Sequence, residues 1–256
     1  MKVATFNANS VRARLPIIEE WLDREKPDLL CLQETKVQDK DFPETAFREK
    51  DYHLISKGQK SYNGVALVSK YPLSDVNCEL YGTEDEEARF ISARIRDLHV
   101  ISVYVPQGYA AGTEKFQYKL RWLKDLLEHI KGTYKPDMRL LVAGDFNVAL
   151  EPIDVYDPEK FEGEVCFHPE ERAILRDYLN WGLRDLFRMY ERGDRKYTFW
   201  DYRIPNAVKR NWGWRLDYIL VTEPLARRST GAWVDLEPRL KERPSDHTFL
   251  AAQFNL

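Results

Sequence analysis

Cysteine, histidine and long apolar runs are scarce in this sequence, and each shortage narrows the kind of protein it can be. Its 256 residues include three widely spaced cysteines, with no Cys-x-x-Cys pair, and five scattered histidines. A disulfide framework or a zinc cluster is therefore not expected, and reduced thiols are typical of a cytoplasmic protein. The sequence contains no run of about 18 apolar residues, so no membrane span is expected. The N-terminal residues predict a strand rather than a signal peptide. We expect a cytoplasmic protein without a membrane partner.

An excess of positive charge, a flexible linker and two common catalytic motifs are also missing. The net charge is −3, from 39 Lys and Arg against 42 Asp and Glu. This balance neither predicts nor excludes a nucleic-acid partner, because electrostatic footprints are local. Without a Gly/Ser-rich linker or a repeat, residues 1–256 are expected to form a single domain. Neither a P-loop nor the Gly-x-Ser-x-Gly elbow of serine hydrolases occurs.

Hydrophobic patterning predicts a mixture of strands and helices. Helices are expected to begin at Pro16 and Pro169 and to run from Glu114 to Lys131, where Gly132 would end the helix. The strand over 90–95 alternates polar and apolar residues, which predicts cover on one face only. Strands without a strict βαβ rhythm favour stacked sheets flanked by helices. The predicted strands cover residues 3–6, 29–32, 64–69, 90–95, 100–105, 140–143, 216–222 and 249–254.

Residues 140–147, Leu-Leu-Val-Ala-Gly-Asp-Phe-Asn, are the most informative stretch. Four apolar residues predict a buried strand that Gly144 would end. Asp145 and Asn147 follow two residues apart, so both side chains can leave the strand end on the same side. A carboxylate and a carboxamide placed there suit a cation or a phosphate. The alternative is an Asx turn, in which both side chains only satisfy backbone groups.

Several other predicted strands begin or end at polar groups that their own sheet cannot use. Each has a structural alternative: Glu34 could cap a neighbouring element, Asp217 could pair with Arg215, and residues 245–247 could form a turn. Strand ends at one edge of stacked sheets converge in space, however, so together they predict a single site. The polar groups concerned are Asn7, Glu34, Tyr104, Asp217, Asp246 and His247.

The residue types in this set indicate the chemistry. Asp217 beside His247 suits a carboxylate-oriented imidazole that meets a phosphate. The set as a whole predicts metal-assisted phosphodiester hydrolysis, in which the metal neutralises charge and a carboxylate activates water. The oxygen donors that suit a hard cation such as Mg²⁺ or Mn²⁺ are Asn7, Glu34, Asp145, Asn147 and Asp246.

A second informative stretch, residues 197–216, places six aromatic side chains among four basic ones. Such interleaving suits phosphate contacts combined with wedging or stacking against bases or sugars. The alternative is an ordinary aromatic core segment with solvated charges. The aromatic candidates for such contacts are Phe199, Trp200, Trp212 and Trp214, with Arg203 among the basic ones, and Arg12, Arg14, Lys57 and Lys60 could extend a basic rim.

In motifs that run in order along the chain, the sequence resembles exonuclease III and the class II AP endonucleases, within the endonuclease/exonuclease/phosphatase superfamily. Leu-Gln-Glu at 32–34, Gly-Asp-x-Asn at 144–147 and Ser-Asp-His at 245–247 mark the superfamily. Pro-Gln-Gly at 106–108 and Tyr-Thr-Phe-Trp-Asp-Tyr-Arg at 197–203 are similar to the DNA-repair branch. The other matching segments are residues 6–9, 62–66 and 214–217.

The resemblance implies a four-layer α/β/β/α sandwich of two packed mixed β-sheets, deoxyribonuclease I-like, with the active site at one edge of the sheets. It implies that Glu34 binds the catalytic metal, with Asn7 and Asp246 close by. Asp145 would orient or deprotonate the attacking water, which Asn147 would position. His247 and a metal-bound hydroxide are alternative general bases in the family, and one or two metal ions are both possible.

The resemblance also implies how DNA would be held. His247, paired with Asp217, would bind the scissile phosphate, and Tyr104 would support the phosphate or the leaving group. The pocket for a flipped-out abasic sugar is apolar because its guest lacks a base, and a normal nucleotide would clash there. The expected DNA contacts are Gln107, Arg203, which would insert into the duplex, and the pocket residues Phe199, Trp214 and Leu216.

We therefore expect a monomeric, Mg²⁺-dependent AP endonuclease of the prokaryotic cytoplasm, with Mn²⁺ able to substitute. It would cleave double-stranded DNA 5′ to abasic sites, leaving a 3′-hydroxyl, and would act on blocked 3′ ends as a 3′→5′ exonuclease and 3′-phosphodiesterase or phosphatase. One alternative is a phosphoesterase of the same superfamily acting on lipid or inositol phosphates. Another is a DNA-binding module that has lost catalysis.

Overall fold

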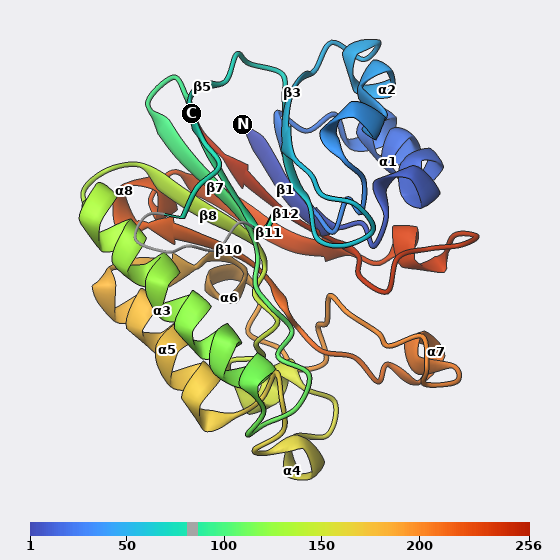
Figure 1. Ribbon diagram of the computed structural model, residues 1–256, viewed down its shortest axis with the longest axis vertical. Helices are drawn as coiled ribbons and strands as arrows, with labels where there is room; N and C mark the ends of the chain where they lie inside the picture. Colours follow the sequence, from blue (N-terminus) through green and yellow to red (C-terminus); the bar gives the residue numbers. More distant parts are fainter. Residues whose placement is uncertain (81–86) are drawn as a thin grey trace.

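The computed structural model describes residues 1–80 and 87–256, whose strands form two six-stranded sheets (Figure 1). Sheet A has the order β11-β12-β1-β2-β4-β3, and sheet B has the order β5-β6-β7-β8-β10-β9. The strands of sheet A are β1 (Lys2–Asn7), β2 (Leu29–Gln33), β3 (His53–Lys57), β4 (Val65–Ser69), β11 (Ser229–Asp235) and β12 (Phe249–Phe254). Those of sheet B are β5 (Ser74–Asn77), β6 (Phe90–Ile95), β7 (Leu98–Tyr104), β8 (Leu140–Asp145), β9 (Leu183–Asp185) and β10 (Asp217–Thr222).

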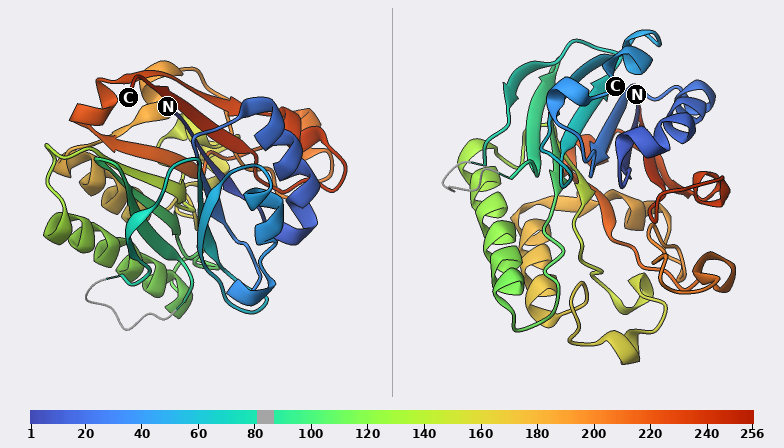
Figure 2. Two further views of the ribbon diagram at one scale, coloured as in Figure 1. Left: turned by 90° about the horizontal axis from the view of Figure 1, so that it is seen from above. Right: turned by 45° about the vertical axis from the view of Figure 1, so that its right-hand side comes forward.

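Helices cover the outer face of each sheet, and the inner faces pack together (Figure 2). Helix α1 packs on sheet A, and α3 and α5 pack on sheet B, which confirms the predicted four-layer sandwich. No helix in the described part of the chain is long and apolar enough to span a membrane. The helices are α1 (Val11–Glu25), α2 (Glu44–Arg48), α3 (Glu114–Thr133), α4 (Pro158–Phe161), α5 (Pro169–Trp181), α6 (Leu186–Tyr190), α7 (Ala207–Arg210) and α8 (Glu223–Ala226).

The two sheets share one strand pattern, and this pattern positions the site. In each sheet the central pair is parallel, β1 with β2 and β7 with β8, and every other neighbouring pair is antiparallel. Helices α1 and α3 make the crossovers within the two parallel pairs. Because parallel strands end at the same edge, Asn7 lies beside Gln33 in sheet A and Tyr104 lies beside Asp145 in sheet B. Four strand ends therefore carry polar residues to one region.

All eight predicted strands are present, and the four that were not predicted are the four edge strands β3, β5, β9 and β11. Edge strands are partly exposed and commonly carry polar residues, so they lack the apolar run or alternation that marks a strand in sequence. Strand β5, for example, reads Ser-Asp-Val-Asn. The expectation for β6 was wrong in one respect: α3 covers one face and sheet A the other, so Ser92 is buried as well.

Three expected boundaries were also wrong. Gly144 does not end its strand but lies inside β8, where a Cβ atom would stand 2.0 Å from the carbonyl oxygen of Val103 in β7. Glycine is required there by the close approach of the neighbouring backbone. Helix α3 continues through Gly132 to Thr133. Helix α1 begins five residues before Pro16, so this proline lies inside a continuous helix instead of starting one.

A buried group of ions holds the start of β10. Arg215 is completely buried, and its guanidinium lies 2.7 Å from Asp154 Oδ1 and 2.8 Å from Asp185 Oδ2. Arg188 also pairs with Asp154. Burial acts to raise the pKa of Asp154, but the two guanidinium groups lower it below its ordinary value. The cluster therefore depends on an ionised Asp154, and it shows that Arg215 is not the partner of Asp217.

We predict that Asp154→Ala lowers the free energy of unfolding by about 3–5 kcal/mol at neutral pH, because it leaves buried guanidinium groups without compensation. The lowered pKa means that this contribution is present above the ordinary pKa of an aspartate and is lost as the pH falls through the lowered value. Denaturant unfolding at neutral and acidic pH measures both effects. The difference between wild type and variant should shrink on acidification.

The matched control is Arg227→Ala, which breaks a solvent-exposed ion pair with Glu223. Exposed pairs contribute little, so this variant should unfold close to wild type. An equal loss in both variants would show that burial of the Asp154 pair has no special effect.

Candidate active site

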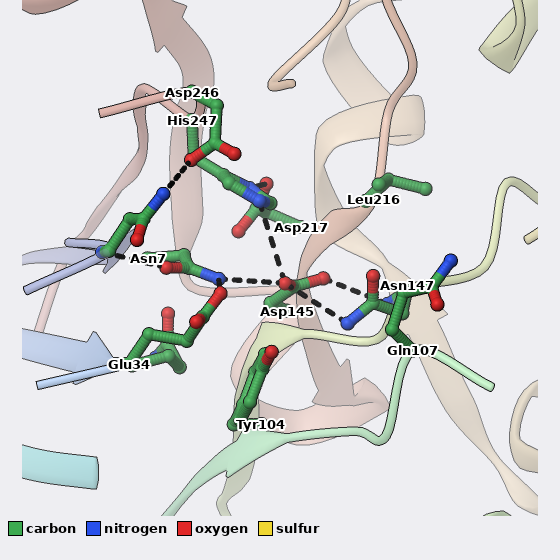
Figure 3. A network of polar contacts seen from close by, with 12 residues as sticks. Asn7, Glu34, Tyr104, Gln107, Asp145, Asn147, Leu216, Asp217, Asp246 and His247 are labelled. Carbon is green, nitrogen blue, oxygen red and sulfur yellow. Dashed lines mark hydrogen bonds and ion pairs between the residues drawn. The ribbon is translucent and has the colours of Figure 1, made fainter. Parts of the chain in front are cut away.

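A hydrogen-bond network joins the strand ends of the two sheets (Figure 3). Asn7 ends β1, Glu34 follows β2, and Asp145 ends β8. The buried amide of Asn7 donates to Glu34 Oε1 and to Asp145 Oδ2, both at 2.9 Å. Since Asn7 and Glu34 come from sheet A and Asp145 from sheet B, this amide connects carboxylates across the interface between the sheets.

Asp145 and Asn147 form both an Asx turn and part of this network. The backbone N–H of Asn147 donates to Asp145 Oδ1 at 2.8 Å, as the turn interpretation requires. The Asn147 side-chain amide donates to Asp145 Oδ2 at 3.2 Å and to the carbonyl of Val105 at 2.9 Å. Asn147 has a φ of 51°, so a left-handed residue, not strand alternation, turns its side chain toward Asp145. The turn and the site are therefore the same feature.

A buried aspartate–histidine pair faces Asp145. His247 Nδ1 lies 2.8 Å from Asp217 Oδ2, and His247 Nε2 lies 3.6 Å from Asp145 Oδ2. Strand pairing sets this geometry, because Asp217 is opposite Asp145 in the β8–β10 register. Burial acts to lower the pKa of His247, but the charges of Asp217 and Asp145 raise it to about 10. His247 is therefore a cation at neutral pH, with both ring nitrogens protonated.

Burial also shifts the groups around this cation. It raises the pKa of Asp145 to about 7, against the opposing effects of His247 and of the hydrogen bond from Asn7. Burial and the nearby charges of Glu34 and Asp145 raise the pKa of Tyr104 well above its ordinary value. Tyr104 therefore stays a neutral hydroxyl, and the guanidinium of Arg89 lies over its ring at 4.9 Å from the ring centroid.

The donor set of the site fits a hard divalent cation. The carboxylates of Glu34 and Asp246 line the same cavity as Asp145, and such oxygen donors suit Mg²⁺-like ions. Asp145, Asp217 and His247 also lie close enough together to be considered as ligands. Asp217 and His247 already hydrogen-bond each other, however, so Glu34 and Asp246 are the better candidates.

Two predicted metal ligands have other roles in this structure. Asn7 and Asn147 were expected to offer oxygen atoms, but both amides act as hydrogen-bond donors to carboxylates. The Asn7 oxygen already accepts the backbone N–H of Asn9 at 3.0 Å. Asn9 in turn donates to Asp246 Oδ1 at 3.0 Å. These amide nitrogens orient the carboxylates, so a metal contact by Asn7 or Asn147 would be made through the carboxamide oxygen, and it stays a prediction.

A cavity of about 550 Å³ opens beside these groups. One wall carries carboxylates and His247, and the other wall is formed by apolar side chains. The ring of Phe199 lies 4.9 Å from that of His247, and the ring of Trp214 lies 4.8 Å from that of Phe161. Arg203 is almost fully exposed at this cavity. Five residues predicted to contact DNA line it, namely Gln107, Phe199, Arg203, Trp214 and Leu216.

Two other predicted DNA contacts lie elsewhere. Trp200 is 2% exposed in the core beside Tyr197, so the core interpretation is correct for it and its side chain cannot reach DNA in this conformation. Its backbone N–H instead donates to the carbonyl of Asp246 at 2.8 Å. Trp212 is 36% exposed and stacks on Tyr156 outside the cavity.

Of the four residues suggested for a basic rim, two have internal partners. Arg14 donates to the hydroxyl of Tyr202 at 2.9 Å and to the carbonyl of Pro244 at 3.0 Å. Lys57 donates to the carbonyl of Cys78 at 2.7 Å. Arg14 and Lys57 thus hold loops in place.

Sequence reasoning missed two basic residues beside the site. Arg89 lies against Tyr104, and no pattern in the sequence marks it. Lys119 is completely buried beneath the loop that carries Asn147. It falls on the apolar stripe of α3 next to Leu120 and could have been noticed there, because a charged residue on a buried helix face requires a partner.

Comparison with known proteins places the chain in a family. The endonuclease/exonuclease/phosphatase family matches residues 4–247. Exodeoxyribonuclease III of Haemophilus influenzae is 33% identical, with 99% of this chain and 100% of the relative covered. The structure of an AP endonuclease from Archaeoglobus fulgidus is 44% identical with a TM-score of 0.97, and that of a 3′-5′ exonuclease from Neisseria meningitidis is 37% identical with a TM-score of 0.95. Both cover 100% of each chain. The chain therefore belongs to the endonuclease/exonuclease/phosphatase family and, within it, to the exonuclease III group of AP endonucleases.

Proposed function

We propose that the chain is a DNA-repair phosphodiesterase that uses Mg²⁺ to cleave duplex DNA 5′ to abasic sites, leaving a 3′-hydroxyl. We further propose that it trims blocked 3′ ends through 3′→5′ exonuclease and 3′-phosphodiesterase or phosphatase activity. The whole chain, residues 1–256, would act as one catalytic domain, as a monomer in the cytoplasm. Mn²⁺ would substitute for Mg²⁺.

The main support for the proposal is the composition of the cavity. One wall has groups that can bind a phosphate and a metal ion, and the other wall is apolar. Phe199 belongs to both, because it lines the apolar wall and packs against His247. A sugar that carries no base can enter an apolar pocket without leaving hydrogen-bonding groups unpaired. Phosphate chemistry at one wall and an apolar guest at the other match a flipped-out abasic nucleotide better than a polar inositol headgroup.

The relatives support a DNA substrate. A 3′ phosphatase from Neisseria that is 36% identical, with a TM-score of 0.96, has been solved bound to a product DNA hairpin. The zebrafish DNA repair nuclease APEX1 is 34% identical, with 88% of this chain covered. One of these proteins binds a DNA product and the other is named a DNA repair nuclease, which makes DNA the first substrate to test.

In the proposed reaction, Asp145 activates the attacking water. Its Oδ1 is held by the Asn147 backbone and its Oδ2 by Asn7, which leaves the carboxylate fixed in direction. A carboxyl group with a pKa of about 7 is matched to taking up a proton near neutral pH. Both N–H groups of the Asn147 amide are used internally, so its carbonyl oxygen is the group that can position the water.

The remaining groups stabilise charge on the phosphate. Asp217 fixes the ring of His247, whose Nε2 lies 3.6 Å from Asp145 Oδ2 at the lining of the cavity, so the imidazolium can bind a phosphate oxygen that enters beside Asp145. The neutral hydroxyl of Tyr104 can donate to the phosphate or to the leaving oxygen. A divalent cation held by Glu34 and Asp246 would neutralise negative charge as the phosphate is attacked.

The decisive assay uses a duplex with one tetrahydrofuran abasic analogue. We expect a single nick 5′ to the analogue with Mg²⁺ and none after excess chelator, read on a denaturing gel. The matched duplex without the analogue is the control for specificity. No nick with Mg²⁺ or Mn²⁺, or turnover of an inositol phosphate in its place, would contradict the proposal.

Replacing Asp145 by Asn or His247 by Ala should lower kcat by roughly 10²–10⁴-fold, because each change removes proton transfer or charge stabilisation. Single-turnover cleavage of the tetrahydrofuran duplex measures the loss, and circular dichroism checks the fold. His53→Ala, at an exposed position on β3, is the matched histidine control and should cleave at the wild-type rate. Retained activity in both site variants would remove these residues from catalysis.

Trp214→Ala should weaken discrimination in favour of abasic DNA more than general duplex binding, because Trp214 lines the apolar wall. Removing an aromatic stacking surface there is expected to weaken binding by about 1–3 kcal/mol. Competition binding with abasic and intact duplexes measures the ratio. Trp212→Ala is the matched control outside the cavity, and equal losses in the two variants would place Trp214 outside the pocket.

A further inference from the structure

Lys119 is a charged residue in the protein interior, where removing a charge from water costs free energy. It lies on the inner face of α3, with its side chain 0% exposed. An ammonium group removed from water must be paired and fully hydrogen-bonded. Lys119 meets this condition through Glu171 of α5, whose side chain is also 0% exposed and forms an ion pair with it.

The same ammonium group holds two loops of the candidate active site. It donates to the carbonyl oxygen of Asn147 at 2.6 Å and to that of Gln107 at 3.2 Å. These residues follow β8 and β7, the parallel central strands of sheet B. An ammonium has three N–H donors, and here it faces two carbonyl oxygens, the Glu171 carboxylate and, at 3.8 Å, Cys166 Sγ. Its hydrogen-bonding capacity is therefore matched to this position.

Glu171 is fixed independently of Lys119. Its second carboxylate oxygen accepts the backbone N–H of His168 at 3.1 Å, which completes a capping box at the start of α5. The carboxylate is thus anchored to the helix that carries it. Because Lys119 contacts both Glu171 and the carbonyl of Asn147, it connects the position of α5 to that of the Asn147 loop.

The loops need such an anchor because their backbones are not in ordinary conformations. Asn147 has a φ of 51° and Gly108 a φ of 95°. A Cβ atom on Gly108 would lie 3.0 Å from Cδ of Lys119, so the lysine stem packs directly against this glycine. Left-handed residues in loops persist where surrounding contacts hold them. Lys119 supplies contacts to both loops at once.

We propose that Lys119, backed by Glu171, is a positioning residue for phosphodiester cleavage. It would act by holding the Asn147 carboxamide against Asp145 and by setting the loop that carries Gln107. Lys119 itself touches neither substrate nor metal. This inference rests on the proposed function, since it concerns how the same site is kept in order.

The test is a double-mutant cycle on the tetrahydrofuran duplex with Mg²⁺. Lys119→Met keeps the apolar stem and removes the charge, and we expect kcat to fall by about 10–100-fold, with a much smaller change in KM. In an Asn147→Ala background the same substitution should lower kcat by no more than about threefold, because the residue through which Lys119 acts is already gone. Lys119→Arg should not restore the rate, because a planar fork cannot reach the same three oxygens.

If Lys119→Met does not fold, Glu171→Gln provides a milder disruption of the same ion pair. The new amide can still cap α5, but it places a donor against the ammonium and should lower kcat in the same direction. Glu170→Gln makes the same charge change at the next, exposed position and is the matched control. Tyr178→Phe removes a 2.5 Å hydrogen bond between α5 and α3 but keeps the ring that packs against Phe146, so it controls for loosening of the helix pair. Both controls should keep the wild-type kcat.

A second readout needs no turnover. The side-chain amide resonances of Asn147, assigned by their loss in Asn147→Ala, should shift or broaden in Lys119→Met and Glu171→Gln and stay in place in Glu170→Gln. The inference would be overturned if Lys119→Met lowered kcat by the same factor with and without Asn147→Ala. It would also be overturned if the Asn147 resonances were unchanged in both Lys119→Met and Glu171→Gln. Absence of cleavage by wild type, with the resonances shifting as expected, would instead count against the proposed function alone.

Discussion

The hydrogen bonds from Asn7 to Glu34 and Asp145 are the contacts on which the rest of the site depends, because they join the two sheets where carboxylates from both sheets meet. Glu34, Asp145 and Asp217 converge in a region with little water, where carboxylates repel one another and lose hydration. Amide donors on one side and the imidazolium of His247 on the other compensate them. The sandwich therefore positions the chemistry through the same contacts that let its sheets close at this edge.

The sequence was a good guide to the centre of each sheet and a poor one to its edges. Central strands such as β2 and β8 are continuous apolar runs, because both of their faces are covered. Strands β3, β5, β9 and β11 each have one unpaired side, and their polar residues are compatible with loops as well. Gly144 illustrates a different limit. A glycine predicts a break when only local conformation is considered, whereas here it is required by the backbone of β7, which is remote in sequence.

In the candidate site, too, local motifs predicted some features correctly, whereas other features depend on packing between segments that are distant in the sequence. The spacing of Asp145 and Asn147 correctly predicted that the two side chains would lie together, although a left-handed backbone is the reason. Trp200 could not be distinguished from Trp214 by composition, because both belong to one aromatic segment and only packing buries the first. The partner of Lys119 lies on a different helix, so its role could not be inferred from its own neighbours in sequence.

The shared strand pattern of the two sheets has a consequence for how the site forms during synthesis. Sheet B takes its strands from one continuous part of the chain, β5 to β10, whereas sheet A combines β1–β4 with β11 and β12. Strand β12 lies between β1 and β11, and residues 245–247 immediately precede it. Asp246 and His247 therefore reach Asp145 only when sheet A closes around its last strand. A chain emerging from the ribosome presents Glu34, Asp145 and Asp217 before Asp246 and His247, so the arrangement of the two sheets brings the last two residues of the candidate site into place only after β12 has been made.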